Sequence, residues 1–224
     1  MKTFVLVLAL MVVAAGVSVA ATATIDIYPG WNQIAAPLVP FDPDPMSAFA
    51  EAADGLDAML YRFSPAEGGT IAYDEFDPDS FGGILLGDGF QLNVLSGDNT
   101  LTYEGVEDGV PDAQGVKTDM WISLPGEGSG NGGFHLIGQP FAHSTTVNET
   151  EGISFTDGTD VKDWATAVAD GWVSDIFLGL DPSVGGSFSV SLDGFGDTDS
   201  LEAGHGYWIN TFVDNLAMIV SAEE

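Results

Sequence analysis

The chain has 224 residues, of which 34 are Asp or Glu and only 4 are Lys or Arg. A formal net charge of −30 argues against nucleic acid or an anionic lipid surface as a partner, because both repel an acidic protein. Zero cysteine excludes disulfides and a cysteine-linked lipid anchor, while 45% hydrophobic residues indicate a folded chain.

Residues 1–20 have the pattern of a secretion signal. Lys2 precedes an apolar stretch over 4–15, and Ser18-Val19-Ala20 offers small residues for cleavage. The stretch is short for a bilayer span, so we expect an exported protein without membrane insertion. Cleavage after Ala20 is expected, with cleavage after Ala21 or Ala23 as the alternatives. Loss of Lys2 leaves 3 basic against 34 acidic residues, a net charge of −31. A solvated surface explains this charge most simply; solubility at high salt, divalent cations and a basic partner are the alternatives.

The first half of the remaining chain is predicted to contain short strands and one helix. Alternating residues predict a strand over 25–28 that ends at the Pro29-Gly30 turn. A short helix follows, with Asp44 as its N-cap, Pro45 in its first turn and Gly55 at its end. Its apolar face consists of Met46, Phe49, Ala50 and Ala53. Further strands are predicted over 59–63, 70–73, 90–95 and 101–103.

The second half is predicted to repeat this order. A strand over 120–124 ends at Pro125-Gly126, and a glycine-rich loop follows before a strand from Phe134. Val161, Trp164, Ala165 and Val168 mark the helix, with Trp164 in the core, Asp160 as N-cap and Gly171 as its end. The last strands are predicted over 175–180, 188–192, 207–212 and 216–220.

Three sequence blocks occur once in each half. Gly30–Leu38 returns as Gly133–Phe141, Ser64–Ile71 as Asp181–Phe188, and Gly87–Asn93 as Gly204–Asn210. The last two blocks share one offset of 117 residues, so no gap falls between them. Glycine, proline and apolar residues recur, whereas no set of nucleophiles or ligands does. We therefore expect a mainly β protein with two antiparallel β-sandwich or barrel-like modules packed side by side, each with one short helix.

The expected organisation is a signal peptide at 1–20, a first module at 22–106, an acidic linker at 107–117 and a second module at 118–222. The motifs Gly-Trp-Asn-x-Ile-x-x-Pro, Ser/Asp-Pro-x-x-Gly-Gly and Gly-x-Gly-Phe/Tyr resemble a β-rich module of exported bacterial surface proteins. This resemblance implies a non-catalytic unit that accompanies adhesins, enzymes or cell-surface assemblies, and it carries over no catalytic residue. The second copy departs from the pattern at His135, where asparagine is expected.

Catalytic and metal-binding patterns are weak in this sequence. His135, His143 and His205 are the only histidines, and their spacing gives no reason for them to meet at zinc, so we expect surface or lightly buried positions. Ser129 lies in a plain glycine loop and not in a nucleophile motif. Glycoside hydrolysis needs two carboxylates at a suitable separation. Among 34 acidic residues some pair always meets this requirement, so the number of acids does not indicate a hydrolase. We predict no catalytic, cofactor-binding or metal-binding residue.

Calcium is the one ion for which the sequence offers oxygen ligands at close spacing. Asp193, Asp197 and Asp199 share one turn, and smaller clusters occur at Asp42-Pro43-Asp44 and Asp77-Pro78-Asp79. None has the spacing of a known calcium loop, and Ser80 replaces Asp197 in the first copy. Ordinary acidic turns are the simpler interpretation.

Two tryptophans are predicted to face outward. Alternation places Trp208 opposite the core-facing Tyr207 and Ile209, and it places Trp121 opposite Met120 and Ile122. Such rings suit a seam between modules, a contact between subunits, or a platform for sugars; we favour the seam or contact. Asn148-Glu149-Thr150 is a formal glycosylation sequon and indicates an exposed loop.

These patterns favour a secreted, non-enzymatic structural or adhesive protein of the cell surface. Its expected partners are copies of itself in a filament or sheath, other surface proteins, or glycans. A carbohydrate-binding module that uses Trp121 or Trp208 is the alternative, and a secreted hydrolase is the third hypothesis.

Overall fold

The computed structural model describes residues 20–49, 59–65, 69–96, 99–108, 116–126, 130–148 and 150–222. The signal segment up to residue 19, the expected helix end at Gly55, Ser129 and most of the linker lie outside these ranges. The fold is mainly β, with several antiparallel sheets and few short helices, as predicted; no sheet closes into a barrel. Below, the first half means the described residues of 20–108 and the second half those of 116–222.

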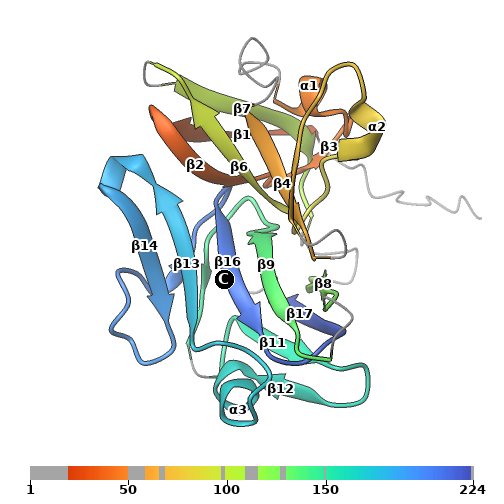
Figure 1. Ribbon diagram of the computed structural model, residues 1–224. Helices are drawn as coiled ribbons and strands as arrows, with labels where there is room; N and C mark the ends of the chain where they lie inside the picture. The colour runs from red at the N-terminus through yellow and green to blue at the C-terminus, as the bar shows by residue number, and fades with distance from the viewer. Residues whose placement is uncertain are drawn as a thin grey trace, which may run out of the picture.

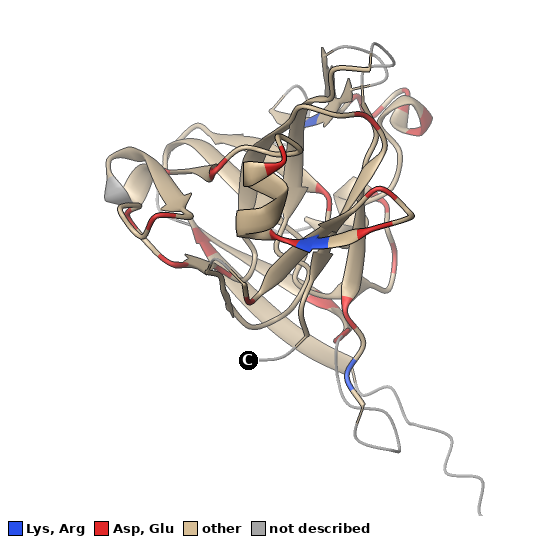
Figure 2. Cartoon of the chain, turned by 90° about the horizontal axis from the view of Figure 1, so that it is seen from below, with Lys and Arg blue, Asp and Glu red and all other residues tan. Residues whose placement is uncertain are grey.

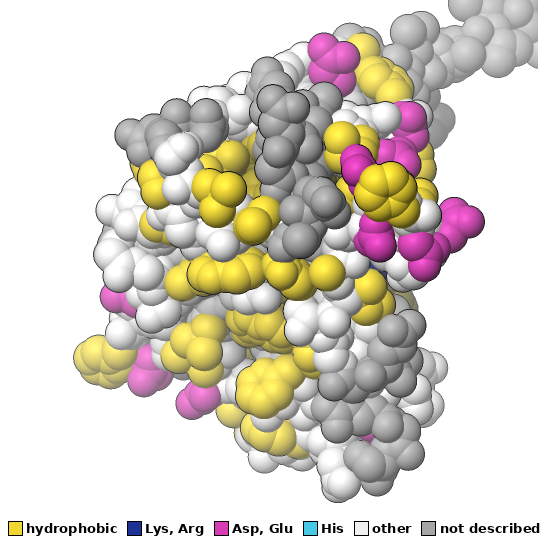
Figure 3. All heavy atoms as spheres, turned by 45° about the horizontal axis from the view of Figure 1, so that its top comes forward, with side chains coloured by type: hydrophobic (Ala, Val, Ile, Leu, Met, Phe, Trp, Pro, Cys, Tyr) yellow, Lys and Arg dark blue, Asp and Glu magenta, His cyan; other side chains and the backbone are white. Residues whose placement is uncertain are grey.

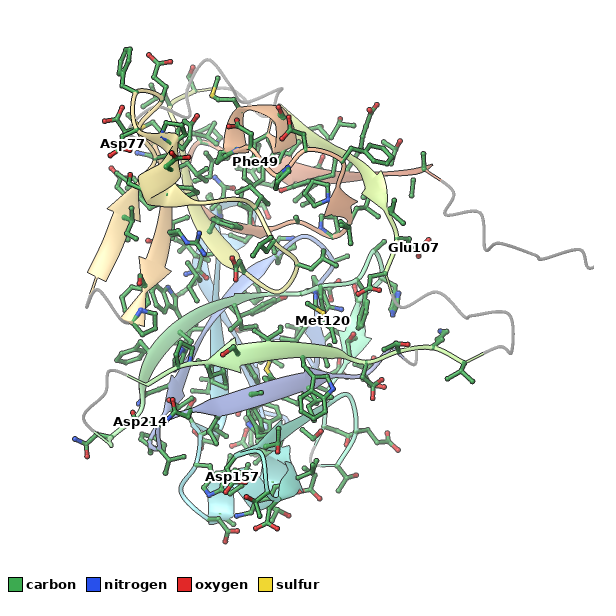
Figure 4. All side chains as sticks on the ribbon, turned by 90° about the vertical axis from the view of Figure 1, so that its right-hand side faces the viewer. Phe49, Asp77, Glu107, Met120, Asp157 and Asp214 are labelled. Atoms are coloured by element: carbon green, nitrogen blue, oxygen red, sulfur yellow. The ribbon has the colours of Figure 1, made fainter. Side chains whose placement is uncertain are left out.

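The first half is a sandwich of two sheets (Figure 1). Its core lies between them and contains residues such as Ile25, Ile34, Phe49, Phe90 and Leu101; Figure 4 shows Phe49 inside this half. One sheet has the order β1 (Ala20–Ile27), β7 (Asn99–Val106), β3 (Val39–Pro40). The other has the order β2 (Gly30–Ala35), β6 (Gly89–Val94), β4 (Leu60–Ser64), β5 (Gly69–Ala72). The helices α1 (Pro45–Ala48) and α2 (Pro78–Phe81) are short.

The second half is a second sandwich with its own core, in which Trp164 is fully buried, as predicted. One sheet has the order β12 (Val161–Asp163), β11 (Ile153–Thr156), β17 (Leu216–Val220), β8 (Met120–Leu124). The other has the order β14 (Gly186–Ser191), β13 (Ile176–Asp181), β16 (Gly206–Thr211), β9 (Gly133–Gly138). The short pair β10 (Thr145–Thr146) and β15 (Ser200–Leu201), helix α3 (Trp164–Ala169) and the turn η3 (Pro182–Val184) complete it.

The strand orders of the two halves correspond. The order β2-β6-β4-β5 matches β9-β16-β13-β14, and the pair β1-β7 matches β8-β17. The repeated sequence blocks therefore occupy like places: Gly30–Leu38 and Gly133–Phe141 contain β2 and β9, and the blocks from Gly87 and Gly204 contain β6 and β16. The two copies share a topology as well as a pattern.

The helix of the second half begins later than its apolar spacing predicts. Val161–Asp163 forms strand β12 and pairs with β11, so Val161 is exposed and not on a helix face. The N-cap is Asp163, whose carboxylate accepts the N–H of Thr166 at 2.7 Å, and not Asp160. Asp160 instead closes a turn, because its N–H donates to the Asp157 carboxylate. The cap predicted in the first half is confirmed: Asp44 accepts the N–H of Met46 at 2.8 Å.

The two halves meet in a seam built by the repeated Gly-x-Gly turns. The N–H of Ala35 at the end of β2 donates to the carbonyl of Gly204 at 2.8 Å. The N–H of Gly138 at the end of β9 donates to the carbonyl of Gly87, also at 2.8 Å. Gly138 is the sequence equivalent of Ala35, and Gly204 that of Gly87, so the same contact occurs twice with the halves exchanged. An approximate two-fold axis therefore relates the halves.

Glycine is required in the seam because the two backbones approach closely. A Cβ atom on Gly89 would lie 2.5 Å from the carbonyl oxygen of Ile137. On Gly204 it would lie 2.1 Å from the Ile25 side chain in the opposite half, at a φ of +78°. Both distances are shorter than van der Waals contact allows, so a larger residue forces the halves apart.

The variant Gly89→Ala tests this account. Its Cβ meets backbone rather than a side chain that can move, so we expect a loss of about 1–3 kcal/mol in the free energy of unfolding. Gly69→Ala is the matched control, because no atom lies within 4 Å of that Cβ position. Urea unfolding monitored by tryptophan fluorescence measures both. Equal stability of the two variants would contradict the proposed close approach.

Candidate functional site

Trp208 lies in the seam and is partly buried. On β16 the side chains of Tyr207 and Ile209 enter the core, while Trp208 faces the other way. Its ring packs edge-to-face on Phe63 of the first half, with ring centroids 4.9 Å apart, and approaches Phe134 of β9 at 6.4 Å. The seam position expected for an outward tryptophan is thus occupied by Trp208.

Trp121 has a different environment. Its side chain is 58% exposed on the outer face of the sheet that contains β8, while its neighbours Ile122 and Leu124 are buried. Figure 4 shows β8, which begins at Met120, along the outside of the second half with β17 beside it. The predicted outward orientation of Trp121 is confirmed, and its ring is available to a ligand or a neighbour.

A cavity of about 340 Å³ opens at the seam and is lined by both halves, including Arg62, Asp88 and His135. Arg62 donates to the Asp88 carboxylate at 2.9 Å and to the carbonyl of Phe81 at 2.6 Å. Burial raises the pKa of Asp88, and the nearby guanidinium opposes that rise. Both partners of Arg62 belong to the first half. Arg62 therefore stabilises the structure of its own half.

His135 is buried, which corrects the expectation of a surface or lightly buried ring. Its side chain is 3% exposed because the inward face of β9 carries it, where Asn32 stands on β2. The ring nitrogen Nε2 lies 3.1 Å from the hydroxyl of Thr211, which also accepts the N–H of Gly133. Burial lowers the pKa of His135 to about 4, so the ring is neutral near pH 7.

The other two histidines lie apart from this contact. The ring of His143 stacks on Phe141 with ring centroids 5.2 Å apart. The backbone of His205 forms an isolated antiparallel β-bridge with Ile34 across the seam. Burial lowers the pKa of His205, while the carboxylates of Asp181 and Glu202 oppose that shift. Within the described residues, no three His, Asp or Glu side chains are arranged to hold a metal ion.

Many carboxylates bind the backbone of their own turns. Asp193 accepts the Ser191 hydroxyl and the N–H of Phe195, and Asp197 accepts the N–H of Ser189. The first of these contacts, from the Ser191 hydroxyl, lowers the pKa of Asp193 most. Asp42 similarly accepts the N–H of Asp44, which is the main reason that its pKa is lowered. Of the acidic residues considered as calcium ligands, Asp42, Asp44, Asp193 and Asp197 thus bind backbone N–H groups near them, whereas the side chain of Asp77 makes no cap hydrogen bond.

Asp214 is a structural residue that the sequence did not single out beyond its turn. Its carboxylate accepts the N–H groups of Gly130 and, at 3.0 Å, Gly132. It therefore fastens the glycine-rich loop before β9 to the turn before β17, as its position at the strand ends in Figure 4 shows. A glycine loop with free N–H groups could cradle an anion, but here a side chain of the chain itself occupies the donors.

A groove of about 630 Å³ lies on the outer face of the second half. We call it the outer groove. No sequence pattern predicts this groove, because its lining comes from three separated segments. The lining includes Asp119, Thr146, Glu151, Ser154, Ile219 and Ser221. Asn148 of the sequon does not line the groove, but its side chain accepts the N–H groups of Thr150 and Glu151, which do.

Charge and apolar groups are distributed over the remaining surface. Asp and Glu are spread over loops and strand ends, while Lys and Arg are few (Figure 2). Lys162 is bound to Asp170 at 2.7 Å and lies 3.6 Å from the Trp172 ring. Hydrophobic side chains cross the middle of the face in Figure 3, interrupted by polar ones.

Comparisons of the chain with family models, with curated proteins and with solved structures gave no match. Among the residues that the structure describes, no helix has the length and apolarity needed to cross a bilayer. The function is therefore argued from the fold and surface of this chain alone.

The two outward tryptophans should differ in their effect on stability. Trp208→Ala removes the contact with Phe63 across the seam, so we expect a loss of about 2 kcal/mol or more in the free energy of unfolding. Trp121→Ala removes an exposed ring, and we expect a change within about 0.5 kcal/mol. Thermal unfolding of the two variants checks this difference; equal melting temperatures would show that Trp208 does not hold the seam.

The buried His135 should make the protein less stable in acid. Its pKa is about 4 in the folded chain and about 6.5 in the unfolded chain, so the unfolded state binds the extra proton. The stability that the neutral ring provides is present above pH 6.5 and is lost as the pH falls to 4. Between pH 7 and pH 4.5 the free energy of unfolding falls in the wild type. We expect this fall to be about 2–3 kcal/mol smaller in His135→Asn.

Asparagine is the natural replacement because Asn32 occupies the matching position in the first half. Urea unfolding of the wild type and the variant at both pH values gives the difference, in which the other titrating groups largely cancel. An identical loss of stability in the two proteins would refute the assignment.

Proposed function

We propose that the protein is a non-enzymatic structural or adhesive unit that acts outside the cell and associates with further copies of itself. The observation that carries this proposal is a pair of strand edges, one in each half. Strand β1 is the edge of its sheet and pairs only with β7, and β8 is the edge of its sheet and pairs only with β17. Neither edge receives another backbone hydrogen bond from the described residues.

These edges suit pairing between molecules. Strand β1 is 8 residues long, although its first residue, Ala20, belongs to the expected signal peptide, and Thr22, Thr24 and Asp26 on its outer face are exposed. Such an edge offers a row of N–H and C=O groups to an incoming strand. Natural proteins blunt edges with Lys, Pro or bulges; β1 carries none of these, and its only charge is Asp26.

The positions of the two edges favour an open assembly. Because β1 and β8 correspond under the approximate two-fold relation of the halves, each molecule presents two similar edges. Pairing of β1 with β8 of the next molecule is a head-to-tail contact, which closes into a ring or continues as a filament. A filament or sheath is thus the expected form.

The use of the polar groups supports a non-enzymatic role. His135 contacts a buried threonine hydroxyl, and Arg62 is bound to its own half. The carboxylates of Asp163, Asp193 and Asp214 bind backbone N–H groups. Catalysis by acid and base needs groups that converge on a substrate, whereas these groups stabilise turns and the seam. The signal pattern of residues 1–20 supports the proposal that the protein is exported and acts outside the cell.

Light scattering after size exclusion, with negative-stain microscopy, tests the assembly. Neighbouring residues of a strand direct their N–H groups to opposite edges, so Thr22→Pro and Ala23→Pro remove donors from different sides of β1. The proline that faces the open edge should preserve the melting temperature and abolish assembly. The proline that faces β7 should lower the melting temperature and serves as the control.

A wild-type protein that stays strictly monomeric at high concentration, with or without calcium, would end the proposal. So would filaments that survive both proline substitutions, since the contact would then lie elsewhere.

A further inference from the structure

We propose that the outer groove binds a neutral oligosaccharide, with Trp121 as the platform on which a sugar ring stacks. This site goes beyond self-association and does not depend on it. The outer groove has a volume of about 630 Å³, which is within the range of small-molecule sites. Its lining combines polar side chains with the apolar side chains of Ile153 and Ile219, and a sugar likewise has polar and apolar surfaces.

Strand register places Trp121 beside the outer groove. Trp121 on β8 lies directly opposite Ile219 on β17, and Ile219 lies opposite Ser154 on β11. Ile219 and Ser154 both line the groove. Directly opposite residues on one face have Cβ atoms about 5 Å apart, so the indole side chain adjoins the groove floor. With 58% of its surface exposed, the ring has a face available to a ligand.

The wall of the outer groove is held in place before any ligand arrives. The Asn148 side chain accepts the N–H groups of Thr150 and Glu151 and donates to the Glu151 carboxylate at 3.0 Å. The N–H of Ser221 donates to the carbonyl of Gly152 at 2.9 Å, which joins this wall to the end of β17. Asp119 accepts the N–H of Ala222 at 3.0 Å. Groups fixed in this way lose little entropy on binding.

The chemistry of the lining selects the class of ligand. Hydroxyl groups come from Thr146, Thr150 and Ser154, and carboxylates come from Asp119 and Glu151. Carboxylates accept hydrogen bonds from the paired hydroxyls of a sugar, and the hydroxyl side chains both donate and accept. Among the described residues no Lys or Arg lines the groove, and the two acids repel an anion. Neutral sugars are therefore favoured over uronic acids, phosphates and nucleic acid.

The experiment is a titration with neutral tetra- to hexasaccharides of glucose, mannose, xylose and N-acetylglucosamine, followed by calorimetry and tryptophan fluorescence. We expect one or more to bind, with a fluorescence change that Trp121→Ala removes. Loss of the stacking ring should raise Kd about tenfold or more. Ser154→Arg, which fills the floor, should also abolish binding.

Trp31→Ala is the matched control, because Trp31 is 42% exposed but lies on β2 in the other half. It should leave Kd unchanged. No binding to any of these sugars at millimolar concentration would overturn the proposal, and so would binding that survives Trp121→Ala. Assembly is scored separately by light scattering, so failure of sugar binding and failure of self-association are distinguished.

Discussion

The close approach of two backbones at the seam is the constraint on which the rest of the structure depends. Two hydrogen bonds related by the approximate two-fold axis, from Ala35 to Gly204 and from Gly138 to Gly87, join the ends of β2 and β9 to the opposite half. Beside these bonds the backbones are so close that a Cβ on Gly89 would lie 2.5 Å from the carbonyl oxygen of Ile137. The repeated Gly-x-Gly turn is thus retained in both copies for packing, and β2 and β9 gain partial cover for edges that would otherwise be open.

Packing in the seam buries part of one outward tryptophan and leaves the other exposed. Equivalent positions in the halves have diverged: Trp208 packs on Phe63, whereas Gln91 stands at the matching place on β6. One tryptophan is therefore committed to holding the halves together. Trp121 lies on the sheet away from the seam and keeps an exposed ring beside the outer groove. Of the two outward tryptophans, Trp208 therefore holds the two halves together, and Trp121 stays exposed on the surface.

Local patterns predicted the fold well, and tertiary contacts limited the rest. The core position of Trp164 and the cap Asp44 follow from spacing and turn chemistry within a few residues, whereas the strand order of the sheets was not predicted. The prediction of Asp160 as N-cap is wrong, because Val161 pairs with β11 as part of strand β12 and the helix begins after it. The burial of His135 and the outer groove depend on which segments the sheets bring together, and no short window of sequence contains that information.

Strong negative charge and self-association are compatible because of where the charge lies. A net charge of −30 repels approaching copies, although salt at 0.1 M confines this repulsion to about 10 Å. The described side chains of β8 carry no charge, and those of β1 carry only Asp26, near one end. Contact at these edges brings few like charges together, whereas contact at the acidic turns brings many. If copies associate as proposed, the acidity would penalise encounters through the acidic turns more than pairing of these strands, and the charge would then contribute to specificity.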